Sequence, residues 1–125
     1  MAENSTTKTL TAGGAISAFR IVKPDAVAGQ VLQAAAATDK LFGVCVNPSG
    51  AASGARIDVD VEGIAMVEFG GTVAAGDPIT ADANGKAVLA APAAGVNNRI
   101  IGFAFEAAVS GDISRVVLGL GQIQG

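Results

Sequence analysis

The chain has 125 residues, a length that suits one domain, and half of its residues are hydrophobic while only 15% are charged. Its net charge of -3 argues against binding to nucleic acid, because contacts with phosphates need clustered Lys and Arg. The chain has no His, Trp or Tyr, and so lacks the commonest general base and zinc ligand and the rings on which sugars stack.

The N-terminal stretch is rich in Ser, Thr, Ala and Gly and shows neither a secretory leader nor a membrane-spanning run. We expect residues 1–18 to form an extended arm with no core of its own, followed by a single β domain over residues 19–125. A short alternating piece gives this arm its strand potential. It consists of Thr7, Lys8, Thr9, Leu10 and Thr11.

Short strands separated by turns are expected from residue 19 onward. Apolar runs at 19–22 and 27–32 flank a turn at Pro24-Asp25, and the Ala run at 34–37 fits either a helical turn or strand and loop, of which we favour the second. The single Cys45 lies in an apolar run, so we expect a buried thiol outside any disulfide.

Residues 57–69 alternate between apolar and polar side chains with a period of two. This pattern predicts one long strand, bent at Gly63, with an apolar face inward and an acidic face outward. Ile64 and Met66 are apolar residues on the otherwise polar face. We therefore predict that these two side chains contact a partner, either another subunit or a different protein.

The acidic face of this strand carries Asp58, Asp60 and Glu62. Three carboxylates on one face suit Ca²⁺ or an acid–base pair, but no His, fourth ligand or loop of oxygen donors accompanies them. We interpret them as a solvent-exposed strand face and expect neither a metal ion nor a cofactor.

Asn84-Gly85 between two apolar segments predicts a β-hairpin with a two-residue type I′ turn. The chain also contains a loose internal echo, which pairs residues 28–32 with 75–80, 40–46 with 99–105, and 53–59 with 110–117. Together these patterns predict a mainly β fold, a small barrel or sandwich with an Asn-Gly hairpin, an internal pseudo-repeat and an extended N-terminal arm.

Four stretches of the second half occur in a characteristic order. They are Val-Ala-Ala-Gly-Asp-Pro-Ile-Thr at 73–80, Ala-Asp-Ala-Asn-Gly-Lys-Ala-Val at 81–88, Arg-Ile-Ile-Gly-Phe-Ala-Phe-Glu-Ala at 99–107, and Gly-Asp-Ile-Ser-Arg-Val-Val-Leu at 111–118. With the strand at 61–67, this order resembles the capsid decoration, or cement, proteins of tailed bacteriophages. The resemblance covers residues 40–118 and rests on turns and strands.

The resemblance implies a structural virion protein, made in the cytoplasm of the host bacterium, that decorates the exterior of the expanded head. It implies binding to the major capsid protein, capsid stabilisation by bridging its subunits, and self-association, often as a homotrimer. In such proteins an N-terminal arm adds a strand to the capsid protein, and here residues 7–11 have the required alternation.

Two other classes remain open. The first is a soluble small-barrel ligand-binding or carrier-like module. A carrier would need an exposed Lys at a hairpin tip, for which Lys86 is the only candidate, and no Met flanks it. A sugar-binding module would need exposed Trp or Tyr, and the chain has neither. A hydrolase using Ser or Asp would lack a base. We therefore expect a protein that is not an enzyme and has neither a nucleic-acid nor a membrane partner.

Overall fold

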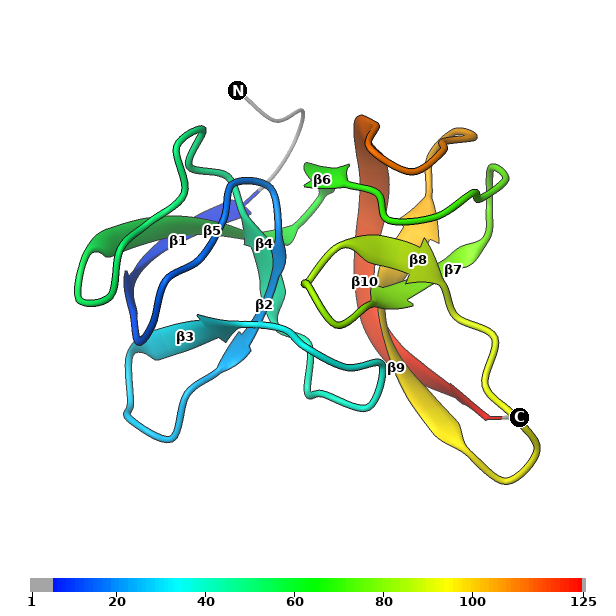
Figure 1. Cartoon of the computed structure of the whole chain (residues 1–125), viewed down its shortest axis with the longest axis horizontal. Helices are drawn as coiled ribbons and strands as arrows, with labels where there is room; N and C mark the ends of the chain where they lie inside the picture. Colours follow the sequence, from blue (N-terminus) through cyan, green and yellow to red (C-terminus); the bar gives the residue numbers. More distant parts are fainter. Residues whose placement is uncertain (1–5, 125) are drawn as a thin grey trace.

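The computed structural model describes residues 6–124 and shows an all-β chain whose two halves lie side by side (Figure 1). The first half is a closed barrel in the strand order β1-β3-β2-β4-β5, and the second is a five-stranded sheet in the order β6-β10-β9-β7-β8. The strands of the first half are β1 (Thr6–Ala12), β2 (Ile21–Pro24), β3 (Gln30–Gln33), β4 (Gly43–Cys45) and β5 (Arg56–Glu62). Those of the second are β6 (Ile64–Glu68), β7 (Pro78–Ala81), β8 (Ala87–Leu89), β9 (Asn97–Ala104) and β10 (Ile113–Gln124). The predicted small β barrel or sandwich is confirmed.

The two halves repeat one topology, with β6 to β10 in the places of β1 to β5. In the first half the antiparallel pairs are β1 with β5, β5 with β4, β4 with β2, and β2 with β3. The second half contains the matching pairs β6 with β10, β10 with β9, β9 with β7, and β7 with β8. The parallel pair of β1 and β3 closes the barrel, and one parallel bridge between Phe69 and Ala87 stands in its place in the second half. The structure therefore contains an internal repeat.

The registers of the two halves match as well. Ala12 pairs with Val31 where Phe69 pairs with Ala87, and Val22 pairs with Gln33 where Ile79 pairs with Leu89. The paired strand positions of one half therefore have equivalents in the other, while the loops between them differ in length.

On this basis the predicted equivalence of 40–46 with 99–105 is confirmed. Residues 53–59 correspond to 110–116, which makes Arg56 equivalent to Ile113 and not to Arg115 as predicted. The first pair of the predicted echo is wrong: residues 28–32 of β3 and its turn correspond to 84–88, because β3 is equivalent to β8 and not to β7.

Two hydrophobic clusters fill the halves. One lies inside the barrel and consists of Ala12, Ile16, Val22, Val31, Cys45, Ile57 and Val59. The other fills the second half and also takes in Ile21, Ala34, Leu41 and Val44 from the first. The outer side of the barrel is thus part of the core of its neighbour, which joins the halves through apolar burial.

The single long strand predicted over residues 57–69 is two strands in different sheets. Gly63, with a φ of 91°, lies between β5 and β6, and this left-handed conformation turns the chain out of the barrel. The predicted acidic face is wrong at Asp60, which is buried because β1 covers it and the Thr7 hydroxyl donates a hydrogen bond to its carboxylate at 2.5 Å. Asp58 is half-buried, and Glu62 alone of the three is exposed.

The stretch that was expected to be an extended arm lies in the barrel from residue 6 onward, and residues 1–5 lie outside the described residues. Thr6 to Thr11 pair with β5, because an alternating segment can lie along an antiparallel neighbour, and Ala12 and Ile16 enter the barrel core. The closed barrel needs this strand, since β1 bridges β5 and β3.

The predicted Asn-Gly hairpin is confirmed, with β7 and β8 as its strands, but the two-residue type I′ turn is wrong. That turn needs a positive φ at both central residues, whereas among the described residues Phe19 is the only non-glycine with one. The connection is instead a five-residue loop in which the carboxylate of Asp82 accepts the backbone N–H groups of Asn84 and Lys86, at 2.8 and 2.9 Å.

Candidate interaction surface

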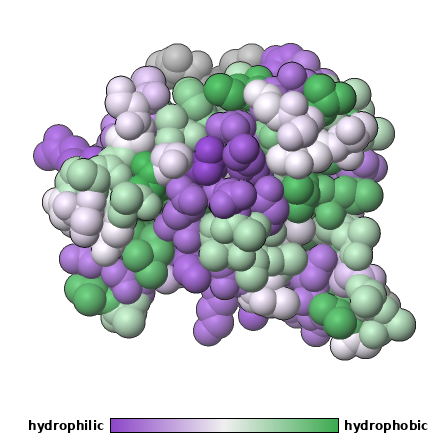
Figure 2. Space-filling model, viewed as in Figure 1, coloured by the Kyte–Doolittle hydropathy of each residue, from purple (hydrophilic) through white to green (hydrophobic). Residues whose placement is uncertain are grey.

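The tip of the β7–β8 hairpin docks on the first barrel. The backbone N–H of Ile21 donates to the carbonyl of Gly85 at 2.8 Å. The carbonyl of Asn84 accepts from Arg20 Nη1 at 2.8 Å and from Gln33 Nε2 at 2.9 Å. Hydrophilic residues gather in a band over the boundary between the halves (Figure 2). This contact, which we call the in-chain junction, is therefore apolar beneath and polar at the hairpin tip.

Glu68 adds an ionic bridge to the junction. Its carboxylate lies 3.4 Å from Arg20 of the barrel and 3.2 Å from Lys86 of the hairpin loop. Burial alone would raise the pKa of Glu68, but the hydrogen bond from Lys86 and the charge of Arg20 outweigh it, so the pKa is lowered. Lys86 is therefore engaged in an ion pair, which argues against a carrier-like role for this side chain.

The residues predicted to meet a partner, Ile64 and Met66, lie on the outer face of the second sheet. Both are half-buried in β6, where Ile64 pairs with Val117 and Met66 with Arg115 of β10. Val117 in turn pairs with Phe103 of β9, and these two side chains are 41% and 45% exposed. We call Ile64, Met66, Phe103 and Val117 the apolar face.

Phe103 and Val117 were missed at the level of sequence, although a signal was present. Residues 99–106 and 113–118 place apolar residues on both sides of their strands, and so do not show the alternation typical of a sheet with one wet face. Beside the apolar face, Arg115 lies 4.4 Å from the ring centre of Phe105 and pairs with Glu106 at 2.8 Å. A cation thus borders the exposed rings.

Residues 7–11 occupy the equivalent strand of the first half. In the matching registers Thr7 corresponds to Ile64 and Thr9 to Met66, so the two predicted contact sets take the same places in the repeat. Thr7 and Thr9 donate hydrogen bonds to Asp60 and Asp58, at 2.5 and 3.1 Å. Lys8 is exposed. Leu10 packs against the barrel core and Thr11 is half-buried.

No metal site accompanies the carboxylates: the part of the chain that the structure describes holds no group of His, Cys, Asp or Glu arranged to bind a metal ion. Cys45 is buried as predicted, and burial raises the pKa of its thiol. Within residues 6–124 there is no helix with the length and hydrophobicity to cross a membrane.

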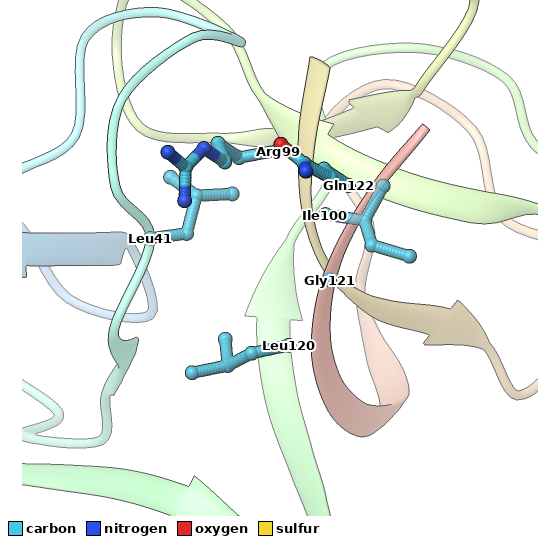
Figure 3. A pocket seen from close by; sticks show the side chains of 6 residues that line it. All are labelled: Leu41, Arg99, Ile100, Leu120, Gly121 and Gln122. Carbon is cyan, nitrogen blue, oxygen red and sulfur yellow. The ribbon is translucent and has the colours of Figure 1, made fainter. Parts of the chain in front are cut away.

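An open pocket of about 340 Å³ lies between the two halves, and Leu41 of the barrel faces Arg99 and Leu120 of the second sheet across it (Figure 3). Ile100, Gly121 and Gln122 complete its lining. Arg99 is the only charged side chain in that lining, so the pocket offers neither a nucleophile nor a base.

Comparisons with known proteins agree with this architecture. A model of the family described as phage cement protein matches residues 2–120. The crystal structure of head fiber gp8.5 N base in bacteriophage phi29 superposes with a TM-score of 0.69 at 20% identity, covering 97% of this chain and 99% of that one. No curated protein sequence matches the chain.

Proposed function

The chain belongs to the phage cement protein family, whose role is structural, and from this premise we propose that it decorates the exterior of the phage head and stabilises the expanded shell by bridging major capsid protein subunits. The observation that carries the proposal is the exposed apolar face of the second sheet. The pocket between the halves has no nucleophile or base in its lining, and the described residues contain no group arranged to bind a metal ion. An exposed apolar surface suits a partner rather than a substrate.

The proposed contact with the capsid is made by Thr7, Lys8, Thr9, Leu10 and Thr11 of β1. Among the described residues, Thr11 and Ala12 are the only ones of this strand that pair on the side toward β3. The rest of that edge therefore has backbone groups available for an extended segment of the major capsid protein. Strand addition of this kind relies on main-chain hydrogen bonds and so tolerates the plain Thr-rich sequence found here.

We further propose a homotrimer, made in the host cytoplasm before it joins the virion. Three copies would bring three β1 strands to the shell at once, and multivalent attachment holds firmly even where each contact is weak. Ile64 and Met66 are proposed to serve either the contact between subunits or the contact with the capsid.

Co-sedimentation with expanded, undecorated phage heads tests the capsid contact. Saturable binding at a stoichiometry that matches the capsid lattice is expected for the wild type. Lys8→Glu should weaken this binding, because it places a carboxylate beside the proposed strand edge, whereas Lys40→Glu makes the same change of charge at another exposed Lys and should bind normally. Absence of saturable binding, or equal loss in both variants, would contradict the proposal.

Ile64→Asp tests the other predicted contact. The side chain is half-buried on an outer face, so the variant should fold while losing assembly or head binding. Circular dichroism checks the fold. Normal assembly and normal binding by a folded Ile64→Asp protein would remove Ile64 from the interface.

A further inference from the structure

The in-chain junction covers one particular set of positions on the first half. Ile21 and Val44, on the outer side of the barrel, have no exposed surface at all. Gln33 bonds to the carbonyl of Asn84, and buried Gly85 lies against Ile21 and Ala34. The β7–β8 hairpin of the second half covers Ile21 and Gln33, and Val44 is buried in the hydrophobic cluster that fills the second half.

Within residues 6–124, nothing covers the same positions on the second half in this way. Because the registers match, Ile21 corresponds to Pro78, Gln33 to Leu89 and Val44 to Phe103. Leu89 and Phe103 are 43% and 45% exposed, and Pro78 is half-buried. We call Pro78, Leu89 and Phe103 the docking face.

The hairpin that corresponds to β7–β8 is β2–β3, and its tip is also uncovered. Gly29 has a φ of 79° and corresponds to Gly85, with a φ of 73°, but Gly29 is exposed and no atom beyond its chain neighbours lies within 4 Å of where its Cβ would be. Val27, beside Ala28 at this tip, is 55% exposed. The first half therefore has an uncovered hairpin tip, and the second half has an uncovered docking face.

The contacts at the hairpin tip of the in-chain junction are polar, and the equivalent residues on the β2–β3 tip and on the docking face are apolar. In the in-chain junction the carbonyl of Asn84 accepts from the polar side chain of Gln33, and the carbonyl of Gly85 accepts from the N–H of Ile21. At the equivalent positions stand Val27 with Ala28, Leu89, and Pro78, which has no N–H to leave unpaired. The polar contacts of Asn84, Gln33 and Ile21 thus correspond to apolar residues on both the β2–β3 tip and the docking face. Matched surfaces of this kind bind each other.

We propose that the β2–β3 hairpin of one copy docks on the docking face of a second copy, so that the in-chain junction is repeated between chains. The contact is heterologous, since it joins two different surfaces, and it leaves each copy with one surface for a further neighbour. A heterologous contact closes into a ring when its rotation allows, which is the form that the proposed homotrimer requires. The inference concerns the protein alone and does not depend on capsid binding.

Sedimentation velocity on the purified chain tests the contact through three matched variants. Val27→Asp alters the hairpin tip and Phe103→Asp alters the docking face, while Val109→Asp changes another Val, 52% exposed, that belongs to neither. The wild type and Val109→Asp should form the same oligomer. Val27→Asp and Phe103→Asp should each weaken self-association by roughly tenfold or more, with unchanged circular dichroism.

Mixing the two interface variants distinguishes this arrangement from a two-fold symmetric one. In the mixture the intact hairpin of Phe103→Asp can meet the intact docking face of Val27→Asp. We expect a one-to-one complex that grows no further, because its outer surfaces are both altered. A wild type that stays monomeric, a Phe103→Asp protein that still forms the wild-type oligomer, or a mixture that stays monomeric would each overturn the proposal. Failure of head binding alone would leave these outcomes unchanged.

Discussion

Replacing Gly85 with Ala should loosen the in-chain junction, and the repeat supplies its control at Gly29. Both glycines have left-handed φ values, of 73° and 79°. An Ala at either site carries a conformational penalty of about 1–2 kcal/mol, partly offset by about 0.4–1 kcal/mol because the unfolded chain loses freedom. These contributions are common to both variants and cancel in their difference.

The packing cost of the added methyl group differs between the two sites and does not cancel. At Gly85 a Cβ would lie 2.8 Å from Gln33 Cγ and 3.1 and 3.2 Å from the carbonyl oxygens of Ala34 and Ile21, whereas at Gly29 nothing lies within 4 Å. Overpacking of this kind costs about 1–3 kcal/mol. At about 4 °C per kcal/mol for a chain of this size, Gly85→Ala should melt about 4–12 °C below Gly29→Ala.

Thermal and urea unfolding followed by far-UV circular dichroism measure this difference. Both variants are made in the Phe103→Asp background, so that contacts between copies add nothing to the stability of either. Equal melting temperatures, or a lower one for Gly29→Ala, would refute the idea that the close approach of Gly85 to the barrel joins the halves.

Two further predictions concern polar contacts. Thr7→Val should lower the free energy of unfolding by about 1–3 kcal/mol, because buried Asp60 loses its hydroxyl donor. Thr9→Val removes an exposed hydrogen bond and should have a much smaller effect. Equal losses of stability in urea unfolding would contradict this prediction. Glu68 has a lowered pKa in the folded state, so its stabilising contribution is complete above its ordinary pKa of 4.5 and is lost as the pH falls through the lower folded value. Glu68→Gln should therefore be less stable than the wild type at neutral pH and should lose less stability on acidification, and parallel pH profiles would be the contrary result.

Local signals in the sequence predicted the strands and turns best. The hairpin at Asn84-Gly85 was found from two residues and their apolar flanks, and the burial of Cys45 from its neighbours. The turn type was missed because the side chain of Asp82 organises the loop, and this competes with the dipeptide preference.

Long-range pairing was harder to predict. The alternation of residues 57–69 continues through Gly63 without a break, so nothing in it shows that β5 and β6 belong to different sheets. The outward side of β5 is covered by β1 at Asp60, and this depends on where the N-terminal strand pairs rather than on local pattern. Ala28-Gly29 and Ala75-Gly76 look alike because both end turns, and only the strand register shows that they are not equivalent.

Within the apolar face, Ile64 and Met66 stand out in the sequence because each breaks an alternating pattern, and their contact with a partner stays a prediction. Phe103 could not be found in the same way, since β9 is apolar on both faces. What distinguishes Phe103 is that its equivalent, Val44, is fully buried while Phe103 is not. That contrast exists only once the two halves are compared in space.

The pairing of the first strand of each half with the last has a consequence for synthesis of the chain. The barrel cannot close until residue 62 has been synthesised, because β1 pairs with β5 along its length. At that stage Ile21 and Val44 are still bare, since the residues that cover them belong to the second half and are made later. During synthesis the first half therefore carries an exposed apolar surface until the second half follows, and such a surface is the kind on which partly made chains associate.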